Sequence, residues 1–191
     1  KELRDYVGGA KLTALAFFDA GSRNIMTKTG PIKEPSDLAG LKIRVMDSNA
    51  LLAAVERLGA TAMPMSQGEV YGALQTGVID GWENNPATCL NFSMQETGCK
   101  HFAWTRHVSI PDVFVVSTAW YNALPAPLKE AVDTAAAETR DYQRKLWAED
   151  EEQAIAKLKA AGMEFNEVDT KAFTDRITGF YDTFVAKYGK G

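Results

Sequence analysis

One segment limits the possible folds of this chain more than any other. From Pro125 to about Ala161 nearly every residue favours a helix. Pro127 suits the first helical turn, and Gly162 can end the run. A helix longer than about 25 residues is more than one compact lobe can cover. The segment therefore predicts a helix that crosses two lobes.

The first half of the chain alternates between strand and helix patterns. Strands are expected at 41–46, 61–65 and 77–83, with a helix in each interval between them. Ser66 and Glu69 are expected to form a capping box that opens the second of these helices. This order is typical of parallel strands, and ligands of open α/β sheets bind at the carboxyl ends of such strands. Arg44, near the end of its strand, and the segment "GWENN" after the last strand are therefore expected at one edge. Residues 112–117 are expected to form a buried crossover strand.

The composition excludes several classes of protein. No apolar run approaches the roughly 20 residues of a membrane span, so no stable membrane insertion is expected. A net charge of −4 with scattered basic residues argues against a nucleic-acid partner. Cys89, Cys99, His101 and His107 match no metal spacing, so we expect no metal site and no cofactor. The two cysteines are either free core thiols or one disulfide.

The stretch "GVIDGWENNP" at 77–86 places several polar side chains directly after an apolar run. Asp80 and Glu83 could act as acid and base in glycoside hydrolysis. Positions three apart on a strand point to opposite sides, however, so a structural role for both carboxylates is favoured. No Gly-x-Ser-x-Gly elbow and no phosphate loop occurs, and we expect no catalytic residue.

Two arginines are candidate anion ligands. Arg44 stands between Ile43 and Val45, where an unpartnered charge is costly. Its planar fork suits a carboxylate, but a structural ion pair with Glu83 or Asp47 is an equal alternative. Arg23 lies in a Gly-Ser-Arg turn, where arginines are usually solvated.

The other polar candidates each have a plain structural alternative. Asn84 and Asn85 suit recognition of hydroxyls and carboxylates, but asparagine is also a common turn residue. Trp82 could cover a sugar face or fill a core between lobes. The residues alone leave both choices open.

The motifs "GLKIRV" and "LGATAMPMSQGEVYGALQTGVIDGWEN" resemble the solute-binding proteins of TRAP transporters, the DctP-like family. The resemblance covers essentially the whole chain, including "IPDVFVVS" and the long helix. It implies an α/β fold of two lobes, like that of periplasmic binding proteins, with a long helix spanning both. Such a protein lies in the periplasm, closes on an organic acid and delivers it to the membrane permease subunits of a TRAP transporter.

The resemblance also assigns roles to individual residues. The arginine that clamps the ligand carboxylate falls on Arg44, and a second arginine falls on Arg23. The asparagine of the "DGxEN" motif falls on Asn84, with Asn85 beside it. Asp80 and Glu83 are expected to hold the shape of the cleft. Three further positions complete the expected ligand-binding set, namely Gln67, just before the "EVY" helix, Trp82 and Glu83 itself.

Two details of the resemblance indicate the chemical class of the ligand. Sialic-acid binders tend to carry an aromatic residue where this chain has Gln67, and a polar residue there favours a ligand with hydroxyls. Trp82 and "HVSIPDV" are more similar to sugar-acid binders, so a uronate or aldonate is favoured. A C4-dicarboxylate or another small organic acid is the alternative, and a hydrolase using Asp80 and Glu83 is a distant one.

The resemblance further predicts how the chain divides. Residues 1–20 are expected to belong to lobe I with a crossover strand, and 21–109 to form lobe II, which clamps the ligand. Residues 110–149 are expected to return to lobe I with the start of the long helix. Residues 150–191 would hold the end of that helix and a final strand and helix against the lobes. Because family members usually carry more chain before "KELRDYV", an amino-terminally truncated protein lacking the first part of lobe I is expected.

Overall fold

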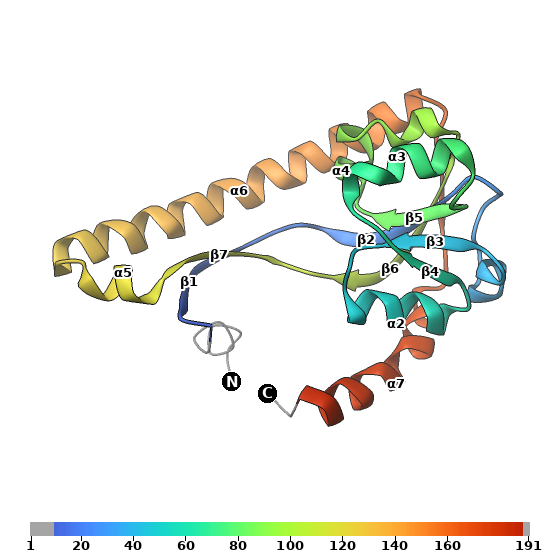
Figure 1. Ribbon diagram of the computed structural model, residues 1–191. Coiled ribbons are helices and arrows are strands. Elements are labelled where there is room, and N and C mark those ends of the chain that lie inside the picture. Colours follow the sequence, from blue (N-terminus) through green and yellow to red (C-terminus); the bar gives the residue numbers. More distant parts are fainter. Residues whose placement is uncertain (1–9, 189–191) are drawn as a thin grey trace. The chain divides into compact units, whose positions relative to one another are not determined.

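Figure 1 shows a computed structural model of the chain, in which residues 10–188 are described. The chain divides into two compact units, and each is described on its own. Unit 1 holds the residues up to Gly21 together with Ile110–Asp150, and unit 2 holds Ser22–Ser109 and the residues from Glu151 onward. The predicted long helix is confirmed as α6, Ala126–Ala160, which contributes residues to both units. The assignment of the segments to closing lobes stays a prediction.

Unit 2 is built on a mixed sheet of six strands in the order β4-β3-β5-β2-β6-β8. β3 is parallel to β4 and β5, as the alternation of strands and helices predicted. β2 runs antiparallel to both β5 and β6, and β8 is parallel to β6. The strand bounds are β2 Ser22–Thr27, β3 Lys42–Val45, β4 Thr61–Pro64, β5 Gly81–Asn84, β6 His101–Ser109 and β8 Glu164–Glu167.

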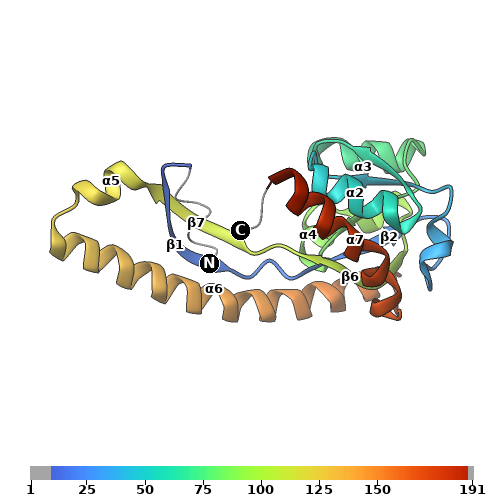
Figure 2. The same ribbon diagram turned by 90° about the horizontal axis from the view of Figure 1, so that it is seen from below.

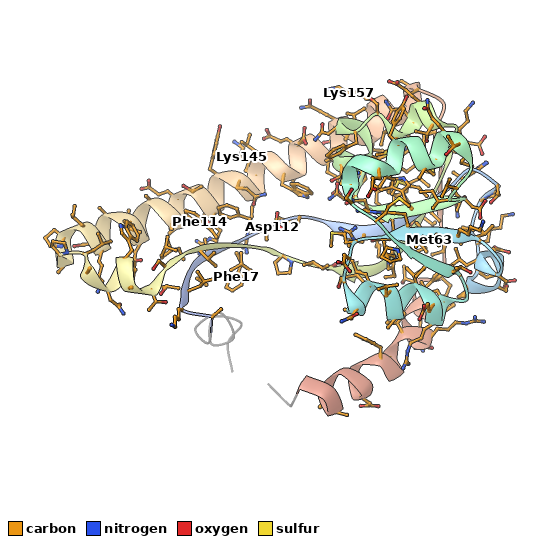
Figure 3. The ribbon with its side chains drawn as sticks, viewed as in Figure 1. Phe17, Met63, Asp112, Phe114, Lys145 and Lys157 are labelled. Atoms are coloured by element: carbon orange, nitrogen blue, oxygen red, sulfur yellow. The ribbon has the colours of Figure 1, made fainter. Side chains whose placement is uncertain are left out.

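Helices cover both faces of this sheet (Figures 1 and 2). α2 and α7 pack on the face that carries Ile25 and Ile43. α3, α4 and the 3-10 helix η2 pack on the face that carries Met26 and Trp82, and Met63 of β4 borders this second core (Figure 3). The bounds are η1 Pro35–Leu38, α2 Asn49–Leu58, α3 Gln67–Thr76, α4 Pro86–Asn91, η2 Met94–Thr97 and α7 Thr170–Tyr188. Within residues 10–188, no helix combines the length and apolar character that crossing a membrane requires.

The loops around α3 follow from local sequence. Ser66 and Glu69 form a reciprocal capping box at the start of the helix. Gly77 ends it with a φ of 74°, a conformation that suits glycine. β5 therefore begins at Gly81, later than the predicted strand start at residue 77, because residues 78–80 leave the helix first.

Unit 1 contains a two-stranded antiparallel sheet of β1 (Leu12–Phe18) and β7 (Asp112–Ser117), followed by α5 (Thr118–Ala123). Phe18 and Phe114 stack with their ring centroids 5.8 Å apart, and Figure 3 marks Phe114 on β7. The expectation of a buried β7 is wrong for this structure, because Val113 and Phe114 are each 39% exposed. Among the described strands, β7 pairs with β1 alone. A two-stranded sheet shields its side chains poorly from solvent.

Both cysteines are free and wholly buried in the core beside Trp82, so the core-thiol alternative is confirmed. Burial raises the pKa of the Cys89 thiol to about 12 and also raises the pKa of Cys99. Neither thiol is therefore ionised at neutral pH.

A pair of glycine substitutions tests the packing of β5 against β2. A Cβ at Gly81 would lie 2.3 Å from the Met26 carbonyl oxygen and 2.9 Å from Ile43 Cδ1. We expect Gly81→Ala to lower the free energy of unfolding by about 3 kcal/mol, since backbone atoms must move. Gly72→Ala is the matched control, because nothing lies within 4 Å of a Cβ at this helical position. It should be neutral or stabilising by about 0.5–1 kcal/mol. Urea unfolding followed by circular dichroism measures both, and equal stabilities of the two variants would contradict the packing.

Candidate ligand-binding site

Arg44 occupies the third position of β3 and is only 2% exposed. Its neighbours Ile43 and Val45 lie in the core beneath α2 and α7. Because side chains alternate along a strand, Arg44 points to the opposite face, where α3 begins. The strand therefore places a cation at the carboxyl end of parallel strands, the edge at which the sequence predicted a site.

The Arg44 guanidinium is oriented by the segment that follows β4. Its Nε and Nη2 donate to the Met65 carbonyl oxygen, at 2.9 Å and 2.7 Å, and its Nη1 donates to Gln67 Oε1 at 3.1 Å. A guanidinium carries five N–H donors. These bonds engage three, and one N–H remains on each terminal nitrogen. A carboxylate can accept from both of these at once.

No ion pair of Arg44 with an acid is present among the described residues, so neither Glu83 nor Asp47 neutralises it as the alternative hypothesis required. Burial lowers the pKa of Arg44 from its ordinary value, while the more distant charge of Glu83 acts in the opposite direction. A guanidinium stays charged despite such a shift. Arg44 is thus a buried cation whose direct partners are neutral.

An open hollow of about 580 Å³ lies over Arg44. It is lined by residues from the ends of β3 and β4 and the start of α3, namely Arg44, Met46, Asp47, Pro64, Met65, Ser66 and Gln67. The amino end of α3 adds partial positive charge at the same place, and the Glu69 carboxylate of its capping box offsets part of that charge. The Gln67 Nε2 is buried and, within residues 10–188, has no hydrogen-bond partner. The hollow therefore offers several N–H donors, as an anion site requires.

Arg23 lies on β2 and does not join this hollow. Its Nη2 donates to Glu83 Oε1 at 2.7 Å and to the Glu83 carbonyl oxygen at 3.0 Å, and its Nε donates to Glu83 Oε2. The expectation of a solvated turn arginine is wrong, because antiparallel pairing with β5 brings the two residues together. Glu83 neutralises Arg23, whereas no described acid forms such a pair with Arg44.

Glu83 is wholly buried and receives a second neighbour from β6. His107 Nε2 lies 3.8 Å from Glu83 Oε2, and His107 Nδ1 is 2.8 Å from Thr105 Oγ1. Burial acts to raise the pKa of Glu83, but the neighbouring His107 and Arg23 side chains outweigh it, and the pKa is lowered. Glu83 is therefore a buried carboxylate that stays ionised and holds its neighbours in place.

Trp82 and the two asparagines have structural roles in this chain. Trp82 has no exposed surface and fills the core under α3, so a role in covering a sugar receives no support. Asn84 Oδ1 accepts from the Asn85 N–H at 2.9 Å. Asn85 Oδ1 accepts from Thr88 N at 2.7 Å and caps α4, which is the common use of asparagine at a turn. Ligand contacts by these asparagines stay a prediction.

Asp80 lies at the other end of β5. Its Oδ2 accepts from the Lys42 N–H at 2.8 Å and joins the starts of β3 and β5. Three residues along a strand span about 10 Å, so Asp80 is distant from the edge that holds Glu83. The favoured structural role of Asp80 is confirmed, and the structure does not bring the two carboxylates together.

Comparison with known proteins identifies the family. The model of "Bacterial extracellular solute-binding protein, family 7" (DctP) matches residues 1–188. The chain belongs to the DctP family. The predicted family resemblance and fold class are thereby confirmed.

Solved structures with the same fold carry sugar acids. A TRAP periplasmic solute-binding protein of Sulfitobacter sp. NAS-14.1, solved with bound β-D-galacturonate, is 34% identical with a TM-score of 0.92, covering 97% of this chain and 62% of its own. Another from Chromohalobacter salexigens, with bound D-glucuronate, is 33% identical with a TM-score of 0.92 and the same coverage. The C4-dicarboxylate-binding periplasmic protein DctP of Rhodobacter capsulatus is 35% identical over 182 residues, covering 93% of this chain. The chain spans about half the length of such curated DctP relatives, 54% in that case.

Sequence reasoning missed two groups at this DctP-family site. The Met65 carbonyl oxygen positions Arg44, and a backbone atom leaves no mark in residue types. His107 contacts Glu83 from β6, a strand that comes later in the sequence. The one usable signal was the capping box after 61–65, which indicated that the chain turns sharply at residues 65–66.

The buried pair of Arg23 and Glu83 predicts a pH-dependent stability. Glu83→Gln should lower the free energy of unfolding at pH 7 by about 3 kcal/mol, because the Arg23 charge loses its partner. The folded pKa of Glu83 lies below its ordinary value of 4.5, so this stabilisation is complete above about that pH. It is lost as the pH falls further, and the difference between variant and wild type should shrink. Urea unfolding at a series of pH values measures this difference.

The control for this prediction is a surface pair of the same chemistry. Arg106 Nη1 and Nη2 donate to Glu167 at 2.7 Å and 3.1 Å, but both side chains are largely exposed. Glu167→Gln should therefore change stability by only about 0.2–1 kcal/mol. A Glu83→Gln effect no larger than the Glu167→Gln effect would contradict the account of the buried pair.

Proposed function

We propose that this chain is part of the extracytoplasmic solute-binding protein of a TRAP transporter. The protein acts in the periplasm and delivers a carboxylate-bearing solute to the membrane permease. The solute is a sugar acid, with a uronate or an aldonate favoured. Binding involves no chemical change of the solute. Family membership and the chemistry of the hollow over Arg44 support this function.

The observation that carries the proposal is the state of Arg44. It is a buried guanidinium with one N–H left on each terminal nitrogen and no acid partner among the described residues. An uncompensated charge in such a place is costly, and a carboxylate that docks there removes the cost through charge-assisted bonds. The open hollow lined by Met46, Asp47 and Ser66 gives a ligand access. A carboxylate on a small solute therefore fits the site.

The bound ligands of related structures favour a uronate over other acids. The two solved relatives of Sulfitobacter and Chromohalobacter hold galacturonate and glucuronate, and their fold matches this chain with TM-scores of 0.92. A C4-dicarboxylate is the second candidate, since the Rhodobacter relative is named for that class of ligand and is 35% identical. Both classes place a carboxylate on Arg44, and they differ in what lies next to it.

Hydrolysis by Asp80 and Glu83 has little support. A glycosidase needs its two carboxyl groups on either side of one bond. The Asp80 carboxylate instead accepts from the backbone of Lys42, and Glu83 is wholly buried against Arg23. We therefore propose a binding protein and not an enzyme.

The Arg44→Ala variant tests the proposal. We expect it to bind D-galacturonate at least about 30-fold more weakly than wild type, which corresponds to about 2 kcal/mol for loss of a buried charge pair. Isothermal titration calorimetry on the full-length protein that contains this chain measures both affinities. Circular dichroism first establishes that the variant is folded.

Arg140→Ala is the matched control. Arg140 is a half-buried arginine on α6, outside the hollow over Arg44, and its Nε donates to Asp141 at 2.8 Å. Its removal should leave the affinity within twofold of wild type, on the order expected for a surface charge. If Arg44→Ala binds D-galacturonate as well as Arg140→Ala does, the proposed role of Arg44 is wrong.

A further inference from the structure

The two ends of the Gln67 side-chain amide have different surroundings. Its Oε1 accepts from Arg44 Nη1 at 3.1 Å. Its Nε2 is buried and has no hydrogen-bond partner among residues 10–188. Gln67 also lines the hollow over Arg44. The amide oxygen therefore already accepts a hydrogen bond from Arg44, whereas the amide nitrogen donates none to the described residues.

The orientation of this amide is set by chemistry. A guanidinium N–H can only donate, so the amide group that faces Arg44 must be the oxygen. The nitrogen is therefore forced to the other side, and its N–H groups can only donate to an acceptor. A buried donor without an acceptor is unfavourable, so a bound ligand that brings an oxygen there gains affinity.

The position of the ligand carboxylate limits which ligand atom can accept a hydrogen bond from Gln67 Nε2. In the proposed complex the two remaining N–H groups of Arg44 donate to the carboxylate oxygens of the ligand. Gln67 is hydrogen-bonded to the same guanidinium, so its amide nitrogen lies beside that carboxylate. The next atom of the ligand within reach is a substituent on the carbon that carries the carboxylate. In a uronate this is the ring oxygen, and in an aldonate it is the 2-hydroxyl group.

We propose that Gln67 determines specificity by donating a hydrogen bond to an oxygen on the carbon next to the ligand carboxylate. This inference rests on the proposed function, in which Arg44 binds the carboxylate, and it narrows the ligand class. Acids that carry such an oxygen satisfy the Gln67 donor. An unsubstituted dicarboxylate such as succinate has a methylene group there and leaves the donor unpaired. The site therefore selects 2-oxygenated acids.

A matched pair of ligands tests the selection. D-glucuronate carries a ring oxygen next to the carboxylate-bearing carbon, and its carbocyclic analogue has a methylene group in the same place. The wild-type chain should bind D-glucuronate about tenfold more tightly than the analogue, the effect of one hydrogen bond to a buried donor. Gln67→Met removes the donor and keeps the length of the side chain. It also removes the acceptor that Gln67 offers to Arg44, but a loss common to both ligands cancels in the ratio of their affinities. The ratio should therefore fall to about twofold or less.

Gln75→Met is the control on the same helix. Gln75 is exposed, and its Nε2 donates to Tyr71 Oη at 3.3 Å. The substitution should leave the tenfold ratio unchanged. Calorimetry on the full-length protein that contains this chain gives all six affinities.

The possible results separate this inference from the proposed function. If wild type binds both ligands equally, the inference is wrong while the binding of sugar acids stands. If Gln67→Met weakens both ligands by the same factor, Gln67 acts on the carboxylate itself, and the inference is again overturned. If wild type binds neither ligand, the uronate proposal fails, and the inference fails with it.

Discussion

The site depends on a guanidinium that the protein buries without neutralising. Transfer of a charge out of water is costly unless hydrogen bonds and an opposite charge compensate for it. In Arg44 the Met65 carbonyl oxygen and the Gln67 amide oxygen supply hydrogen bonds, and no described acid supplies the charge. The fold thus fixes the direction of the guanidinium and leaves its electrostatic partner to be provided from outside. The hollow at the carboxyl ends of β3 and β4 is where that partner can enter.

Arg23 and Arg44 differ in how the protein satisfies their charges. Both residues lie on central strands of the same sheet, but Arg23 makes a two-pronged pair with Glu83, which has no exposed surface. Arg23 is thereby satisfied within the protein. A ligand carboxylate gains more from Arg44, whose charge is uncompensated. The pair of Arg23 and Glu83 joins β2 to β5, and a ligand contact by Arg23 stays a prediction.

Local rules predicted much of the fold correctly. The long run of helix formers became α6, the capping box at Ser66 became the start of α3, and the parallel order of β3, β4 and β5 followed from their alternation with helices. Each of these features is set by residues close in sequence. The placement of Arg44 at a strand end also followed from this order.

The contacts of the site could not be predicted in the same way. The Met65 carbonyl oxygen that holds Arg44 is a backbone atom, and it leaves no trace in residue types. The choice between core and ligand for Trp82 depends on how η2 and α3 cover it, which is a tertiary property. His107 reaches Glu83 from a strand that follows much later in the chain. Long-range packing therefore decided which polar residues are free to bind and which are used by the protein.

The central claim is that a ligand carboxylate supplies the charge that Arg44 lacks. The most direct test compares D-glucuronate with D-glucuronamide, which has the same shape but no charge on that group. Titration calorimetry of the full-length protein that contains this chain should show the amide binding at least about 100-fold more weakly, since a buried charge pair is lost. Affinities within threefold of each other would contradict the account, because the site would then recognise the sugar without its charge.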